Sequence, residues 1–139
     1  MRRVAACLVL ALLLASCGNK AESPDADRSP DPAFAEYGFP AYPLAEPLCD
    51  GRVSGGATEI QWDALVSQDE PAAVLAFYEE ELGSAGFTPD GSDAGTWRIP
   101  ADTPERTLDV RNAADPEVPL TNCPVIPGGS RTVIYLTRR

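Results

Sequence analysis

The stretch EIQWDALVSQDEPAAVLAFYEEELGSAG, residues 59–86, carries the clearest pattern in the chain. Apolar side chains alternate with polar ones over residues 60–66, and a period of two is typical of a half-buried strand. Asp69 and Pro71 then fit the start of a helix, because aspartate caps a helix N-terminus and proline suits its first turn. Apolar residues recur every three or four positions up to Gly86, which would stop the helix. The stretch predicts a strand followed by one amphipathic helix.

The flanking sequence predicts further strands. Residues 51–56 are rich in glycine and suit a turn or hairpin, and residues 87–99 indicate two strands joined by a turn. Residues 106–111 alternate as another half-buried strand, and residues 112–130 form a loop rich in proline and glycine. Residues 131–137 are apolar on both faces, which predicts a central strand. We therefore expect an α+β fold, a small antiparallel sheet with one helix packed on one face.

We assign this fold to a domain of residues 48–139. Its expected core takes one or two side chains from every element: Trp62, Val66, Phe77, Leu82, Trp97, Leu108 and Ile134. Residues 33–47 form an extension rich in proline and aromatic residues. Asp31 and Pro32 predict a single helical turn there, ending at Gly38. The aromatic side chains of this extension lie across the core of the domain or form a docking strip for a partner.

The N-terminus combines two arginines, an apolar run and the ending Leu14-Ala15-Ser16-Cys17. A short apolar run after a basic start is typical of a signal peptide, and about 20 apolar residues would be needed to span a membrane. The ending resembles the lipobox of bacterial lipoproteins. The resemblance implies cleavage before Cys17 and attachment of acyl chains such as palmitate to that cysteine. The alternative is an ordinary secretory signal that leaves Cys17 as a free thiol.

The lipobox divides the beginning of the chain into two functional segments. Residues 1–16 would be a removed signal peptide, and residues 17–32 a lipidated, disordered tether. From residue 18 to residue 32 there is no large apolar side chain, so this stretch cannot bury enough surface to offset the entropy of ordering. We therefore expect a protein anchored by lipid in the cell membrane or outer membrane, facing the periplasm or the exterior.

Charge and composition exclude several classes of function. The chain has 11 basic and 21 acidic side chains, a net charge of -10, and no histidine. Nucleic acids are bound by clustered lysine and arginine, so this class is excluded. An acidic chain is repelled by an anionic membrane surface, and attachment would depend on the acyl chains. Without histidine the chain lacks the commonest general base and metal ligand, and we expect neither a metal site nor a cofactor.

Two cysteines remain once Cys7 leaves with the signal peptide and Cys17 carries lipid. An exported protein enters an oxidising compartment, so Cys49 and Cys123 are expected to form a structural disulfide. A closed loop of about 75 residues would contribute about 4 kcal/mol to the free energy of unfolding. A redox-active pair is the alternative, although such pairs more often show Cys-x-x-Cys spacing.

The expected anchor, tether and domain come without an evident catalytic set. The leading interpretation is a lipid-anchored cell-envelope protein with an interaction or accessory domain, which is not an enzyme and has an envelope protein as partner. A ligand-binding or cell-wall-binding module is the alternative, with Trp62 and Trp97 as a stacking surface. A less favoured alternative is a small enzyme that uses the carboxylates of Glu59, Asp63 or Asp109, which flank strands.

Overall fold

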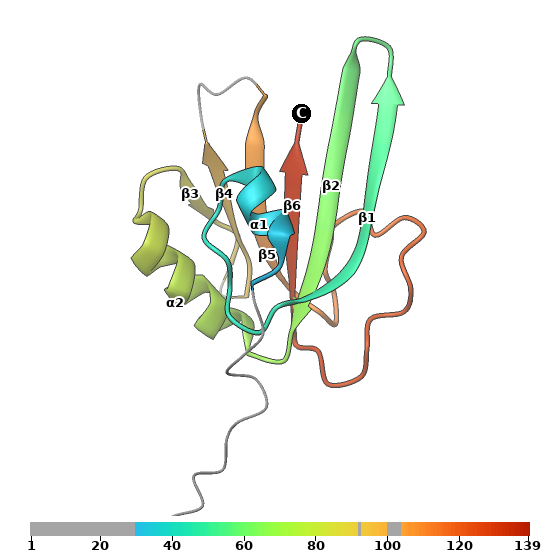
Figure 1. Cartoon of the computed structure of the whole chain (residues 1–139). Helices are drawn as coiled ribbons and strands as arrows, with labels where there is room; N and C mark the ends of the chain where they lie inside the picture. The colour runs from blue at the N-terminus through green and yellow to red at the C-terminus, as the bar shows by residue number, and fades with distance from the viewer. Residues whose placement is uncertain (1–29, 92, 100–103) are drawn as a thin grey trace, which may run out of the picture.

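A computed structural model describes residues 30–91, 93–99 and 104–139 of the chain (Figure 1). Within these residues the protein forms one antiparallel sheet and two helices, so the α+β fold is confirmed. The elements in chain order are α1 (Pro32–Tyr37), β1 (Glu46–Gly55), β2 (Thr58–Ser67), α2 (Pro71–Leu82), β3 (Phe87–Pro89), β4 (Gly95–Ile99), β5 (Arg106–Asn112) and β6 (Thr132–Arg138). The expected signal peptide, the lipobox and most of the expected tether lie outside the described residues.

The last strand lies in the middle of the sheet, as its apolar sequence predicted. The strand order is β1-β2-β6-β5-β4-β3, and residues 132–137 are all buried. The register aligns Ile134 with Leu65 on one side and with Val110 on the other. Successive side chains of a strand point to opposite faces. We call the side that bears Ile134 the first face and the side that bears Tyr135 the second face.

Both helices lie over the first face, together with the segment that joins α1 to β1 (Figure 1). One helix was expected on the sheet, and the helical turn expected between Asp31 and Gly38 forms the second, α1. Asp31 caps α1 by accepting a hydrogen bond from Ala33 N at 2.9 Å, and Gly38 ends it with a φ of 74°. The buried residues of this first core are Ala33, Phe34, Tyr37, Phe39, Tyr42, Ala45, Leu65, Val74, Leu75, Tyr78, Trp97, Leu108, Val110, Ile134 and Leu136.

The aromatic side chains of residues 33–47 are part of that core. Phe34 and Tyr37 are fully buried, and Phe39 and Tyr42 nearly so. This confirms the interpretation that they lie across the core of the domain, and it leaves no exposed aromatic docking strip in this segment. We therefore place the start of the folded unit at Asp31 and not at residue 48, because residues before and after residue 48 contribute to the same core.

The helix α2 begins one residue later and ends earlier than the sequence indicated. Glu70 occupies the N-cap position, whereas the Asp69 carboxylate accepts a hydrogen bond from Tyr42 Oη at 2.7 Å. The helix ends at Gly83. Gly86 instead forms the turn into β3, where its carbonyl accepts a hydrogen bond from Arg98 N at 2.9 Å. Asp69 thus connects the extension to the domain instead of capping the helix.

A disulfide and a long hairpin shape the second face. Cys49 and Cys123 form the expected disulfide, with their Cα atoms 5.4 Å apart, and it joins β1 to the loop of residues 113–131. The strands β1 and β2 form the expected hairpin, which turns between Gly55 and Thr58 and projects beyond the end of β6 (Figure 1). A second, smaller cluster lies under the loop: Leu48, Cys49, Trp62, Ala64, Val118, Leu120, Cys123 and Tyr135.

Candidate functional site

A groove of about 440 Å³ lies on the second face, which no described helix covers. The hairpin, the strands β4 and β5, and the 113–131 loop form its walls, and β2 and β6 form its bottom. We call it the second-face groove, and its lining residues are Val53, Ile60, Trp62, Thr96, Arg98, Thr107, Asp109, Arg111, Glu117, Val118, Pro119, Thr121, Tyr135, Thr137 and Arg139. The register brings them together, because Trp62, Thr137, Thr107 and Arg98 form one row across four strands.

Two stacked aromatic rings form the bottom of the groove. The ring centroids of Trp62 and Tyr135 are 5.6 Å apart, and their planes differ by 24°. The Trp62 ring also lies across β1 at Gly51, where a Cβ would come within 2.4 Å of it. Both rings are nearly buried, whereas Val53 is 58% exposed and Ile60 is half-buried. The rings thus support the groove, and Val53 and Ile60 extend its apolar surface to the mouth.

Hydroxyl and guanidinium groups line the opposite side. The hydroxyls of Thr107 and Thr137 are hydrogen-bonded to each other. Arg98 Nε lies 2.8 Å from Glu105 Oε1. The main-chain nitrogen of Arg139 donates to the Glu105 carbonyl at 2.9 Å, whereas its guanidinium forms no ion pair with any residue that the structure describes. This side of the groove is therefore polar, with one arginine paired to a carboxylate and a second one that has no ion pair among the described residues.

A network of ion pairs closes the end of the groove near Arg111. Arg111 Nη1 lies 2.6 Å from Asp90 Oδ2, and Nη2 lies 3.4 Å from Asp109 Oδ1. The Thr96 hydroxyl donates a hydrogen bond to the same Asp109 oxygen. Burial lowers the pKa of Arg111, but hydrogen bonds and charge from Asp90 and Asp109 raise it on balance. The guanidinium stays charged and holds Asp109 in place.

The phenol of Tyr135 is neutral at physiological pH. Burial raises its pKa to about 12, with a further increase from the charge of Asp109 and a partial decrease from Arg139. Tyr135 Oη donates to the Pro119 carbonyl at 3.4 Å. Tyr135 therefore fixes the loop over the groove and does not supply a base.

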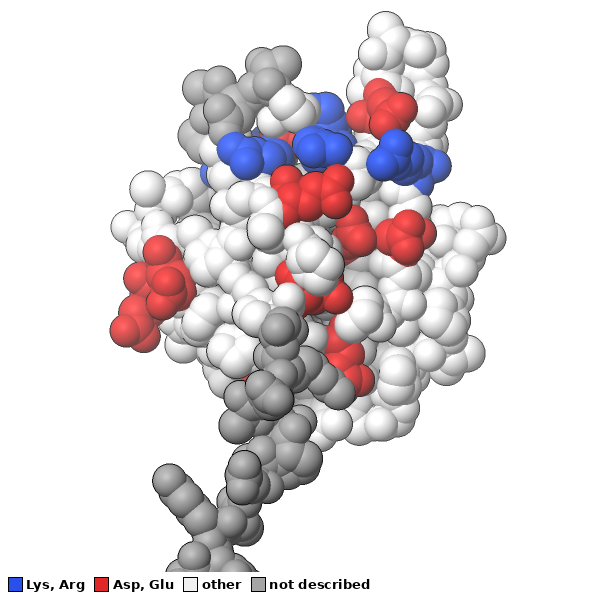
Figure 2. Space-filling model, viewed as in Figure 1, with Lys and Arg blue, Asp and Glu red and all other residues white. Residues whose placement is uncertain are grey.

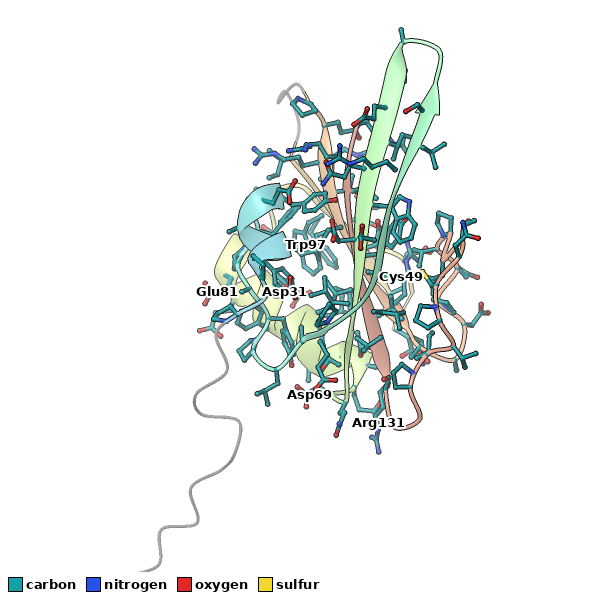
Figure 3. All side chains as sticks on the ribbon, turned by 45° about the vertical axis from the view of Figure 1, so that its right-hand side comes forward. Asp31, Cys49, Asp69, Glu81, Trp97 and Arg131 are labelled. Atoms are coloured by element: carbon teal, nitrogen blue, oxygen red, sulfur yellow. A yellow bond between two sulfur atoms is a disulfide. The ribbon has the colours of Figure 1, made fainter. Side chains whose placement is uncertain are left out.

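The two tryptophans do not form a joint stacking surface, so that expectation was wrong. Trp97 is 2% exposed and packs in the first core, with its ring centroid 4.2 Å from that of Phe87. Trp62 belongs to the cluster of the second face. In Figure 3 Trp97 and Cys49, which lies in the Trp62 cluster, appear on opposite sides of the central strands. Only Trp62 lines the groove.

The three candidate carboxylates lie in three separate environments. Asp63 accepts a hydrogen bond from Tyr37 Oη at 2.6 Å on the first face, where carboxylates spread below a row of arginines (Figure 2). Glu59 lies at the exposed hairpin, 3.9 Å from Arg52. Asp109 alone lines the groove. In residues 30–91, 93–99 and 104–139 no group of three or more acidic or cysteine side chains could hold a metal ion.

The sequence did not identify most of the groove. Thr107, Thr137, Arg98 and Arg139 lie on three different segments, and only the register places them side by side. A partial signal was present in the closing strand, where Tyr135 alternates with apolar residues that face the first core. Cys17, the expected lipidation site, lies outside the described residues.

Comparisons with known proteins provide no family to which the groove could be assigned. No protein-family model matches the chain, and no curated protein or solved structure is significantly similar to it. Neither described helix has the length and apolar character that crossing a membrane requires. The functional argument therefore depends on the second-face groove and on the N-terminal sequence.

Proposed function

We propose that the protein is a lipid-anchored cell-envelope protein whose domain binds a small ligand in the second-face groove. The observation that carries this proposal is the groove itself, whose volume of about 440 Å³ is typical of small-molecule sites. Such sites combine apolar walls with a few fixed polar groups. The apolar hairpin side and the threonines and arginines opposite it have this combination.

Binding is favoured over catalysis by the state of the groups in the groove. Asp109, a candidate catalytic carboxylate, is engaged by Thr96 and Arg111. The pKa of Tyr135 is raised to about 12 by burial, so its phenol is a poor base near neutrality. Asp109 and Tyr135 thus fix the lining of the groove, and we propose no reaction for them.

The ligand site is tested with phenylnaphthylamine, a neutral apolar dye whose fluorescence rises on binding. We expect the wild type to bind it, and Val53→Trp to bind at least about tenfold more weakly, because the larger side chain fills the groove mouth. Val125→Trp is the matched control, since Val125 is 92% exposed and does not line the groove. Absence of binding to the wild type, or equal weakening in both variants, would overturn the proposal.

The lipid anchor is supported by the sequence Leu14-Ala15-Ser16-Cys17. The described folded unit begins near Asp31, which leaves residues 17–30 as a tether between lipid and domain. Metabolic labelling with an alkyne fatty acid is expected to mark the wild type and a Cys7→Ser control but not Cys17→Ser. Labelling of Cys17→Ser at the wild-type level would contradict the anchor.

A second candidate function is docking of an envelope protein, as the sequence suggested. It is favoured by the edge strand β1, which among the described strands pairs with β2 alone and whose outer half is exposed. Such an edge can accept an added strand from a partner. A photo-crosslinker at Ser54 is expected to capture one partner protein in cells, whereas a crosslinker at the exposed Ala72 of α2 is not. Equal products at both positions would count against this function.

A further inference from the structure

The lining of the second-face groove is apolar on the hairpin side and polar on the side of β4 and β5. On the hairpin side its lining consists of Val53, Ile60 and Trp62, which are all apolar. The row of Trp62 continues with the hydroxyl-bearing residues Thr137 on β6 and Thr107 on β5. A ligand that satisfies both sides needs an apolar body and a polar group at one edge.

Two guanidinium groups flank the polar side. Arg98 pairs with Thr107 in the sheet register, and Arg139 follows Thr137 by two residues. Arg98 is 60% exposed in its side chain and contacts Glu105 through Nε. Arg139 forms no ion pair with the described residues, and it lines the groove. Both arginines can therefore donate to an anion placed beside the threonine pair.

Three carboxylates have to be weighed against these arginines: Glu105, Asp109 and Glu117. Glu105 is paired with Arg98 Nε. Asp109, two residues from Thr107 on β5, is engaged by Thr96 and Arg111. Glu117, the other lining carboxylate, is exposed on the 113–131 loop, across the groove from β4 and β5. With Glu105 on Nε, the Nη groups of Arg98 and the guanidinium of Arg139 are the donors that remain for an anion on this side of the groove.

We propose that the second-face groove binds a dissolved amphiphile with one anionic group. Its apolar body lies against the hairpin side, and its carboxylate, sulfonate or phosphate is bound by Arg98 and Arg139. The inference rests on the proposed function and names the ligand class. A dissolved molecule is favoured over a bilayer lipid because a groove of about 440 Å³ is suited to a drug-sized ligand.

The test uses two dyes that differ by one sulfonate group. Anilinonaphthalene sulfonate carries a sulfonate on the body of phenylnaphthylamine, which is neutral. We expect the full-length protein to bind the sulfonate at least about tenfold more tightly, because charge-assisted hydrogen bonds are stronger than neutral ones. Added salt is expected to reduce this preference. Equal affinity for both dyes would overturn the ligand class while leaving the groove as a binding site, whereas binding of neither dye would overturn the proposed function itself.

Substitutions of arginines test which residues bind the anionic group of the ligand. The double variant Arg98→Gln with Arg139→Gln is expected to lose the preference for the sulfonate, so that it binds the two dyes with similar affinity. Arg52→Gln is the matched control, since Arg52 is 65% exposed, faces Glu59 and does not line the groove. An unchanged preference in the double variant, or equal loss in the control, would overturn the role of the two arginines. In the absence of dye, Cys17→Ser is expected not to sediment with vesicles of phosphatidylglycerol, and sedimentation that depends on Arg98 and Arg139 would overturn the choice of a dissolved ligand.

Discussion

The two faces of this sheet are built from alternate residues of the same strands, yet they serve different purposes. The first face is sealed by α1, α2 and the aromatic segment between α1 and β1, which share one continuous core. The second face holds a small cluster around Trp62 and Tyr135, and a loop held by a disulfide lies over it. Because the first face supplies most of the buried apolar surface, the second face can carry arginines and threonines without losing the fold.

Polar residues show the same contrast. On the first face they attach α1 to the sheet: Gln61 Nε2 donates to Glu36 Oε1 at 2.8 Å, and Arg138 Nη2 donates to Gln61 Oε1 at 2.6 Å. On the second face the guanidinium groups of Arg98 and Arg139 border the groove. Polar groups therefore attach a helix to the sheet on the first face and line a groove on the second.

The largest expected effect comes from removing the cover of the first face. Deletion of residues 18–47 removes Phe34 and Tyr37, and each fully buried aromatic contributes about 1.5 to 3 kcal/mol. Since a typical domain is stable by about 5 to 15 kcal/mol, we expect this variant to be unfolded at about 25 °C. Circular dichroism and urea unfolding measure the effect. Deletion of residues 18–30 is the control and is expected to leave the melting temperature nearly unchanged; a folded longer deletion would contradict the shared core.

The next effect concerns the disulfide that holds the 113–131 loop on the second face. Cys49 and Cys123 are separated by 74 positions, so replacing both by serine is expected to reduce the free energy of unfolding by about 4 kcal/mol. The loop that carries Val118 and Pro119 would lose its attachment, so dye binding is expected to weaken while the secondary structure persists. Urea unfolding with and without reductant checks this, because reductant should affect only the wild type. If the variant and the oxidised wild type have the same free energy of unfolding, the disulfide does not stabilise the fold and the prediction is wrong.

A smaller effect tests the contact between β1 and the bottom of the groove. A Cβ at Gly51 would lie 2.4 Å from Cζ2 of Trp62, so the ring must move in Gly51→Ala. Overpacking of this kind costs about 1 to 3 kcal/mol. Gly55→Ala, in the same strand and with nothing within 4 Å of its Cβ, is expected to change little. Thermal unfolding and the indole NMR signal of Trp62 compare the two, and a Trp62 signal unaltered in Gly51→Ala would refute the contact.

The sequence predicted elements whose signals are local. The alternation of residues 60–66 and the apolar residues 131–137 located β2 and β6 correctly, and Asp31 and Gly38 marked the ends of α1. The Cys49–Cys123 disulfide followed from the cysteine count. The strands and the helix are predicted from residues that are adjacent in sequence. The disulfide follows because only two cysteines remain once Cys7 and Cys17 are assigned to the signal peptide and the lipid. One sequence is therefore enough to predict these features.

Which face a residue occupies could not be predicted, because it depends on the register between strands. Trp62 and Trp97 were both expected in one core, but Trp62 pairs with Thr137 and Trp97 with Leu108, which lie on opposite faces. A shift of one residue exchanges the faces. The groove is assembled entirely by this non-local pairing. Anchor and export concern residues outside the described structure and stay predictions.

The smallest expected effect concerns Asp63, a carboxylate of the first face. Burial raises its pKa above the ordinary value of 3.8; the hydrogen bond from Tyr37 lowers it, and the charges of Asp50 and Glu36 raise it further. The folded state therefore holds the proton of Asp63 more strongly than the unfolded state does. The stability gained from this proton is fully present below the unfolded pKa and is lost as pH rises through the folded pKa.

Asp63→Asn separates this contribution from the rest of the first face. The amide oxygen can still accept the hydrogen bond from Tyr37 Oη, but the side chain no longer ionises. We expect the variant to match the wild type near about pH 3 and to be the more stable of the two near about pH 7, where only the wild type has an ionised, partly buried carboxylate. Melting temperatures across this range measure the difference, and Asp93→Asn, in an exposed turn, is the control. If the variant is less stable than the wild type at neutral pH, the ionised carboxylate of Asp63 stabilises the fold. A difference in stability that does not depend on pH would also contradict the prediction, because it would not arise from the ionisation of Asp63.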